Sequence, residues 1–215
     1  TRKKICYTGR DVMTLEDRVV LVTGGARRVG QAIALAVATR RARVVISYRT
    51  SAKDAHELVK RLERAGAPEA LAVRADLANA SHVRRLMDRL ARRFRRLDVL
   101  VNSAAAFDRT PYRTLTERDW DHALDTNLKG SFLCALYASR LMQRRGGGKI
   151  ITNGSMFSIF GSTVRSAYPA SKGGIVQLTK SLAVAWAKYN IQVNCILPGW
   201  LTTELTAPVY EHPEW

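Results

Sequence analysis

The sequence predicts an α/β fold, in which one doubly wound parallel sheet forms the middle of three layers and helices cover both of its faces. Short apolar runs alternate with longer segments of helical periodicity along the 215-residue chain. The apolar runs are uninterrupted, as expected for parallel strands that are buried on both faces. Six strands are predicted in this way, at residues 19–23, 44–47, 70–73, 99–101, 149–152 and 192–197.

Helical segments separate the predicted strands. Apolar positions three and four residues apart mark each of them, and Thr116 is a suitable N-cap for the longest. If the last helix includes Tyr168, then Tyr168 and Lys172 are one turn apart and share a face. The predicted helices lie around residues 33–38, 52–65, 83–94 and 116–142, and the last runs on from residue 171.

A single domain is expected over residues 14–215, because a chain of this length with 47% hydrophobic residues can bury a core of ordinary size. Residues 1–13 are interpreted as a basic extension that is disordered or non-native, with Met13 as the natural start. No apolar run is long enough to predict a membrane span. The three cysteines lack metal-ligand spacing and predict reduced thiols in a cytoplasmic protein, and no metal site is indicated.

The chain is strongly basic, with 35 lysines and arginines, 18 acidic residues and a formal net charge of +17. Seven of the arginines fall within residues 84–96. Such a charge can attract nucleic acid, acidic lipid or an acidic carrier protein. An apolar stripe of helical spacing beneath these arginines favours another interpretation, a solvated helix face. Nucleic-acid binding is not favoured, because no recognition motif accompanies the charge.

One stretch of the chain carries candidate catalytic chemistry. Tyr168 precedes Lys172 by four residues, and Ser155 lies thirteen residues upstream of the tyrosine. An ordinary phenol titrates near pH ~10 and is a poor acid at neutral pH, but a nearby ammonium favours the phenolate. A serine hydroxyl can hold a carbonyl oxygen beside the phenol. The alternative is coincidence, since a tyrosine and a lysine four residues apart form a very loose pattern.

A glycine-rich turn follows the first predicted strand. Gly24 and Gly30 would let the backbone approach a pyrophosphate at the N-terminus of the next helix, although Arg28 stands where a glycine is common. The second strand ends without the carboxylate that NAD-binding proteins use for the ribose 2′-hydroxyl. Arg49, with Arg27 or Arg28 across the turn, suits a 2′-phosphate and favours NADP(H) over NAD(H).

Two further features each leave two interpretations open. Asp76 closes the third predicted strand, where it can accept a hydrogen bond from an adenine amino group or act as N-cap of the following helix. Met156, Phe157 and residues 159–160, together with Trp200, indicate either a partly apolar substrate pocket or ordinary packing of loops and core.

With these residues in view, the chain resembles the short-chain dehydrogenase/reductase family from about residue 15 to residue 206. Its second half is similar to gluconate- and glucose-type dehydrogenases and to 3-oxoacyl carrier-protein reductases of that family. The resemblance implies a Rossmann fold and an NAD(P)-dependent enzyme acting on CH–OH groups. It rests on the glycine turn, Asp76, the Asn-Ser-Ala-Ala sequence from Asn102, Asn127, Ser155, Tyr168, Lys172 and the Pro-Gly pair at Pro198.

The resemblance also implies roles for individual residues. Tyr168 would exchange a proton with the carbonyl or alcohol oxygen, and Ser155 would orient that oxygen. Lys172 would tune Tyr168 and hold the nicotinamide ribose, and Asn127 would support a water that leads protons out. The implied cofactor-binding residues are Gly24, Arg27, Arg28, Val29, Gly30, Arg49, Asp76, Leu77, Asn102, Ala104, Tyr168, Lys172, Pro198, Gly199 and Thr203.

The chain departs from the family pattern in three places. Arg28 replaces the middle glycine of the turn, and Asn-Ser-Ala-Ala replaces a sequence of the Asn-Asn-Ala-Gly type. The sequence stops at Trp215, where the family continues through another helix and strand, so the fold is expected to lack both. The resemblance implies a small carbonyl or alcohol substrate and a homodimer or homotetramer. The short end leaves an alternative function open, that of a catalytically weak nucleotide-binding module.

Overall fold

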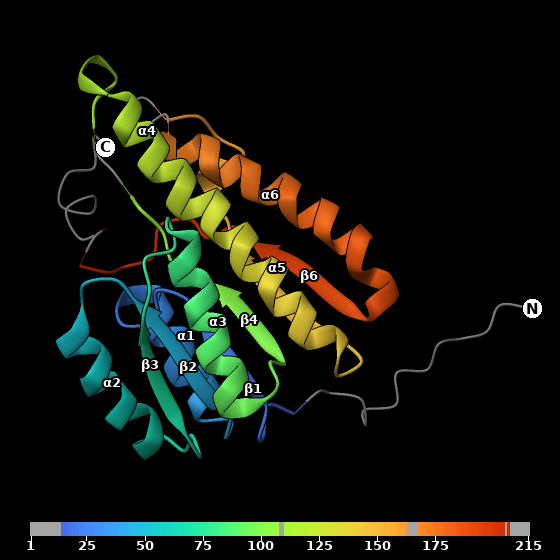
Figure 1. Cartoon of the computed structure of the whole chain (residues 1–215). Helices are drawn as coiled ribbons and strands as arrows, with labels where there is room; N and C mark the ends of the chain where they lie inside the picture. The colour runs from blue at the N-terminus through green and yellow to red at the C-terminus, as the bar shows by residue number, and fades with distance from the viewer. Residues whose placement is uncertain (1–13, 108–109, 163–166, 205, 207–215) are drawn as a thin grey trace, which may run out of the picture.

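Six parallel strands form one continuous sheet at the centre of the computed structural model, which describes residues 14–107, 110–162, 167–204 and 206 (Figure 1). The spatial order is β3-β2-β1-β4-β5-β6, and every adjacent pair is parallel. The strands are β1 (Val19–Val22), β2 (Arg43–Tyr48), β3 (Ala70–Arg74), β4 (Val99–Asn102), β5 (Gly148–Asn153) and β6 (Ile191–Ile196). The predicted sheet is confirmed. The basic extension at residues 1–13 lies outside the described residues.

Helices cover both faces of the sheet and complete the three layers (Figure 1). On one face lie α1 (Arg28–Ala38) and α2 (Ala52–Arg64). On the other face α3 (Ala80–Phe94), α5 (Gly130–Gln143) and α6 (Ala167–Trp186) lie side by side. In the described part of the chain no helix is both long and apolar enough to cross a membrane.

The strands divide their side chains between two apolar cores. Val20 and Val22 of β1 belong to the core beneath α1 and α2, whereas Val19 and Leu21 belong to the core beneath α3, α5 and α6. All four are almost completely buried. Because successive side chains of a strand point to opposite faces, a strand that is apolar at every position needs a covering layer on each side.

The long helix predicted over residues 116–142 is wrong in one respect, because it is interrupted. Its first part, α4 (Glu117–Ala123), begins at a capping box. In this box the Thr116 hydroxyl accepts from the Asp119 amide, and the Asp119 carboxylate accepts from the Thr116 amide. The predicted N-cap is thereby confirmed. A π-helical turn, Leu124–Lys129, then separates α4 from α5.

Contacts outside the helix stabilise this π-helical turn. The Asn127 side chain accepts a hydrogen bond from the Ala106 amide at 2.7 Å and donates one to the Ala106 carbonyl at 3.0 Å. Gly130 approaches Leu77 so closely that a Cβ at position 130 would lie 2.8 Å from the Leu77 Cβ. Helical periodicity does not reveal one extra residue in a turn, and such turns are frequent at functional sites.

The arginine-rich segment forms α3. Val83, Leu86 and Leu90 lie on the inward face of this helix and are completely buried, so the predicted apolar stripe is confirmed. Arg93 pairs with Glu69 at 2.6 Å, and the other arginines within the helix are exposed. This placement agrees with a solvated helix face, the favoured interpretation, and binding of an acidic partner there stays an untested alternative.

Candidate active site

Two adjoining cavities run along the carboxyl ends of the strands. The first encloses about 240 Å³ and the second about 360 Å³. They form one groove, which passes β1 and β4, where the strand order reverses. An open parallel sheet binds its ligands at such a point. The residues common to both cavities are Arg27, Arg28, Ser103, Ala105 and Phe107.

Most of the predicted site residues line this groove. Asn102 and Asn127 are the exceptions, since both are buried and line neither cavity. The first cavity is lined by Arg27, Arg28, Val29, Gly30, Ser155, Tyr168, Lys172, Pro198, Gly199 and Thr203. The second is lined by Gly24, Arg27, Arg28, Arg49, Asp76, Leu77 and Ala104.

The glycine turn between β1 and α1 is held in close contact with the loop after β4. Gly24 has a φ of +63°, and a Cβ there would lie 2.7 Å from the Ala104 Cα. The Thr23 hydroxyl accepts hydrogen bonds from the Ser103 and Ala104 amides at 3.0 and 3.1 Å. A Cβ at Gly30 would lie 2.5 Å from the Gly24 carbonyl oxygen. Only a chain without side chains at these two positions can form this cradle.

Arg28 occupies the left-handed region with a φ of +53°, a conformation that costs an ordinary residue roughly 1–2 kcal/mol. The usual glycine would adopt it without this cost. The arginine is exposed and lines both cavities. Its position therefore adds a positive charge to the groove at the expense of backbone strain.

Arginines are part of the lining of the second cavity. Arg49 at the end of β2 is exposed, whereas Arg27 is paired with Asp54 at 2.5 Å. Residues 47–51 provide no carboxylate to this cavity. His122 of α4, which the sequence patterns did not single out, also lines it.

Asp76 is not the N-cap of α3, so that interpretation is wrong. The cap is Asn79, whose side chain accepts from the amides of Ser81 and His82. The Asp76 carboxylate instead accepts from the Ala78 amide at 3.1 Å and lines the second cavity. The short loop after β3 thus leaves Asp76 available to a ligand, because a residue nearer to α3 satisfies the helix end.

Tyr168 and Lys172 lie one turn apart in α6, as predicted from their spacing. The Lys172 Nζ lies 5.5 Å from the centre of the Tyr168 ring and donates a hydrogen bond to the Asn153 carbonyl at 2.6 Å. Lys172 is 2% exposed, and burial lowers the pKa of its ammonium from 10.5 to about 8. A cation that close to a phenol favours the phenolate.

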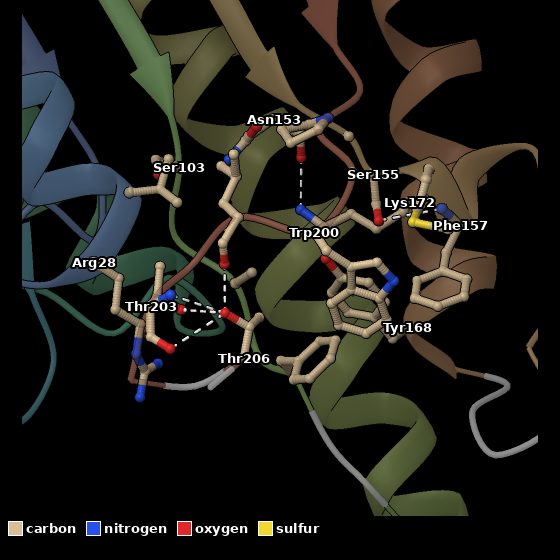
Figure 2. A pocket seen from close by; sticks show the side chains of 18 of the residues that line it. Arg28, Ser103, Asn153, Ser155, Phe157, Tyr168, Lys172, Trp200, Thr203 and Thr206 are labelled. Atoms are coloured by element: carbon tan, nitrogen blue, oxygen red, sulfur yellow. Dashed lines mark hydrogen bonds between the residues drawn. The ribbon is translucent and has the colours of Figure 1, made fainter. Parts of the chain in front are cut away.

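Ser155 begins the short turn Met156–Ser158 after β5 and is 7% exposed. Its hydroxyl accepts from the Phe157 amide at 3.2 Å. Ser158 connects this turn to α6, because its hydroxyl accepts from the Ser155 amide at 3.1 Å and donates to the Lys172 carbonyl at 2.9 Å. Figure 2 shows Ser155, Lys172 and Tyr168 on one side of the first cavity, opposite Arg28 and Thr203.

Asn127 is completely buried and reaches the helix turn that carries Tyr168. Its amide donates to the Ser171 hydroxyl at 2.9 Å, and that hydroxyl donates to the Tyr168 carbonyl at 2.7 Å. The π-helical turn, the loop after β4 and the start of α6 are therefore joined through one side chain. Support of a water by Asn127 stays a prediction.

Aromatic rings surround Tyr168. Phe107 and Phe157 meet it edge-on, with ring centres 4.8 and 6.4 Å away, and Trp200 meets Phe157 in the same way at 5.9 Å. Met156 also lines the cavity, whereas Ile159 and Phe160 are 73% and 61% exposed and do not. Three of the five residues predicted for the apolar pocket therefore line the cavity, namely Met156, Phe157 and Trp200. Phe107 also lines it, and the sequence indicated this residue only by its place after the Asn102 segment.

The groove fits a nicotinamide dinucleotide. Its cradle of glycines admits a phosphate backbone, and a positive groove attracts the phosphates. Among the residues that the structure describes, the Thr126 Oγ1 and the Asn153 Oδ1 are buried and find no hydrogen-bond partner. These residues line the second and first cavities, respectively. Buried polar groups are usually satisfied, so a polar ligand is the natural partner for both.

The buried Lys172 is expected to destabilise the free protein, and Lys172→Met should raise the free energy of unfolding at pH 7 by about 1–3 kcal/mol. Because the folded-state pKa lies below the unfolded one, the cost of the ammonium is complete below pH 8 and disappears as the pH rises from about 8 to 10.5. The two proteins should therefore converge in stability over that window.

Urea denaturation at pH 7 and near pH 10 measures this difference. Lys180→Met makes the same chemical change at an exposed position of the same helix and should alter stability by less than about 0.5 kcal/mol. A Lys172→Met protein that is less stable at pH 7, with a gap independent of pH, would contradict the burial cost.

Comparison with known proteins places the chain in a known family. Residues 18–214 match the family model described as short chain dehydrogenase. The chain is 36% identical over 199 residues to a 3-oxoacyl-[acyl-carrier-protein] reductase of Synechocystis, covering 93% of this chain and 80% of the relative.

Solved structures give the same result. A short chain dehydrogenase of Burkholderia cenocepacia in complex with NADP matches with a TM-score of 0.85 and 34% identity, over 90% of this chain and 78% of that one. An acetoin dehydrogenase of Enterobacter cloacae matches with a TM-score of 0.83 and 30% identity, over 90% of this chain and 80% of that one.

Proposed function

Because the chain belongs to the short-chain dehydrogenase/reductase family, we propose that it is an NADP(H)-dependent oxidoreductase that interconverts a carbonyl and a secondary alcohol. The observation that carries this proposal is the pair formed by Tyr168 and the buried Lys172 at the side of a groove with a glycine cradle. The bound cofactor supplies or accepts the hydride.

Different residues of the groove would contact different parts of the cofactor. The turn from Gly24 to Gly30 and the N-terminus of α1 would hold the pyrophosphate, with Val29 and Arg28 beside it. Leu77 and Ala104 would line the adenosine, and the Asp76 carboxylate would accept from the adenine amino group. At the other end Pro198, Gly199 and Thr203 would contact the nicotinamide, and Lys172 its ribose. Asn102, whose amide donates to the Ser131 carbonyl, would support the loop that lines the cofactor.

Arg49 supports the choice of NADP(H) over NAD(H). An exposed arginine at the end of β2, where a carboxylate would serve NAD, suits a 2′-phosphate through charge-assisted hydrogen bonds. The relative from Burkholderia cenocepacia that was solved with NADP agrees with this assignment.

Tyr168 would act as the general acid and base. In reduction its hydroxyl gives a proton to the carbonyl oxygen, while the Ser155 hydroxyl holds that oxygen in place. In oxidation the same proton returns to the phenolate, which the Lys172 ammonium stabilises. Asn127 would fix the position of the helix turn that carries Tyr168 through Ser171.

The substrate would be a small molecule. The rings of Phe107, Phe157 and Trp200 line the cavity next to Tyr168, which favours a carbonyl with apolar substituents. The 3-oxoacyl group in the name of the Synechocystis relative is also a carbonyl with an apolar substituent, but that name places it on an acyl carrier protein. A cytoplasmic location and a homodimer or homotetramer complete the proposal.

Titration with NADPH and with NADH, followed by nicotinamide fluorescence, tests the choice of cofactor. Arg49→Asp is expected to weaken NADPH binding about 10- to 100-fold and NADH binding less than about threefold, since charge-assisted hydrogen bonds contribute ~1.5–3 kcal/mol. Arg84→Asp, an equal change of charge at an exposed position of α3, should leave both affinities unchanged. Equal losses for NADPH and NADH would remove the argument for NADP(H).

A carbonyl panel tests the reaction itself. Turnover of at least one ketone with NADPH is the expected result. Tight NADPH binding without turnover of any panel member would instead support the alternative function, a nucleotide-binding module.

A further inference from the structure

His122 lies in the second cavity although it comes from α4, 73 residues away from Arg49. Its Nε2 is 3.5 Å from the Arg49 Nη1. The imidazole is half-buried and the guanidinium is exposed, and both side chains line the cavity that would hold the adenosine.

A free helix end does not account for the position of His122. Basic residues often stabilise the C-terminal end of a helix, but α4 continues into the π-helical turn and α5, so it has no free end there. Within the described part of the chain, the hydrogen-bonding neighbour of the imidazole is Arg49. A guanidinium has donors only, so in this contact the imidazole Nε2 can only accept.

Charged groups of both signs surround the imidazole. Across the cavity lie Arg49, Arg28 and the paired Arg27, and one carboxylate, that of Asp76. On its own helix the charged neighbours are Arg118, Asp119 and Asp121, which share a second surface recess with it. Asp119 is already engaged by Thr116 in the capping box.

We propose that His122 is a specificity-determining residue that binds the 2′-phosphate of NADPH together with Arg49, and that it takes up a proton when it does so. A phosphate dianion between the two groups replaces their mutual contact by two charge-assisted hydrogen bonds. Imidazoles are mostly neutral at about pH 7.5, and a dianion favours the charged form. The inference rests on the proposed use of NADP(H).

Isothermal titration calorimetry in two non-phosphate buffers of different ionisation enthalpy measures this proton directly. At about pH 7.5 the free 2′-phosphate is already mostly dianionic, so it has little proton to release on binding. The protein is expected to take up a fraction of a proton more with NADPH than with NADH, because any protonation of Lys172 is common to both cofactors. Because uptake of a proton is linked to the affinity at the same pH, the NADPH affinity should fall relative to the NADH affinity as the pH rises through about 7.5.

Three variants separate the phosphate contact from a structural effect. His122→Gln should weaken NADPH binding about tenfold, leave NADH binding within about twofold and abolish the additional proton uptake with NADPH. His122→Lys, which is cationic throughout this pH range, should restore the NADPH affinity without the additional proton uptake. His56→Gln removes an exposed histidine that does not line the cavity and should change nothing.

Each other outcome overturns the inference. Equal losses of NADPH and NADH in His122→Gln would place the imidazole on the adenosine rather than on the phosphate. Unchanged NADPH affinity, or additional proton uptake with NADPH that survives the substitution, would remove its role altogether. A wild-type protein that prefers NADH would overturn the proposed cofactor and this inference with it, whereas a preference for NADPH that His122→Gln retains in full would overturn the inference alone.

Discussion

Tyr168→Phe is expected to lower kcat about 10³-fold while leaving the NADPH dissociation constant within about threefold, because positioned general acid–base groups contribute roughly 10²–10⁴ to rates. The substitution keeps the ring. Its edge-on contacts with Phe107 and Phe157 and its place in α6 therefore remain. What disappears is the hydroxyl that exchanges a proton with the substrate oxygen.

Steady-state kinetics with NADPH and the best ketone of the panel measure this loss, and fluorescence titration measures the binding. Tyr137→Phe, which removes a hydroxyl from α5 away from both cavities, serves as the matched control. The pH dependence of the residual rate in Tyr168→Phe should also be flat across the acidic and neutral range. A kcat within about tenfold of the wild type would contradict the proposed role of Tyr168.

Gly30→Ala is expected to have the second large effect, the loss of dinucleotide binding together with a destabilisation of roughly 2–4 kcal/mol. The added Cβ would lie 2.5 Å from the Gly24 carbonyl oxygen and 3.0 Å from the Gly25 Cα. Both are backbone atoms. The turn can move away only by disturbing Gly24, which already packs against Ala104.

Urea denaturation and NADPH titration of Gly30→Ala measure the two effects. Gly161→Ala is the matched control, because a Cβ at Gly161 meets no described atom within 4 Å. It should be neutral in both measurements. Wild-type affinity for NADPH in Gly30→Ala would mean that the turn does not carry the pyrophosphate.

The sequence was sufficient for the sheet because apolarity at every strand position has few explanations. The run from Val19 to Val22 could only belong to a strand covered on both faces, and the helices needed for the covering were visible from their own periodicity. The spacing of Tyr168 and Lys172 was similarly informative, because four residues in a helix fix a shared face.

The groove itself required the structure. His122 and Phe107 reach it from segments whose local patterns are those of an ordinary surface helix and an ordinary loop. The Lys172 ammonium donates a hydrogen bond to the Asn153 carbonyl, which belongs to the backbone. The role of a backbone group cannot be predicted from the residue type. The π-helical turn at Asn127 arises from contacts with Ala106 that periodicity along one segment does not contain.

The Ser158 hydroxyl has a mechanical consequence. It is hydrogen-bonded to the Ser155 amide and to the Lys172 carbonyl at once, so it braces the loop after β5 against α6. Thermal fluctuations of α6 relative to the sheet should carry the serine, the lysine and the tyrosine together as one rigid body. Opening and closing of the groove would then change the distance from these three side chains to the glycine turn. The distances among Ser155, Tyr168 and Lys172 would stay constant.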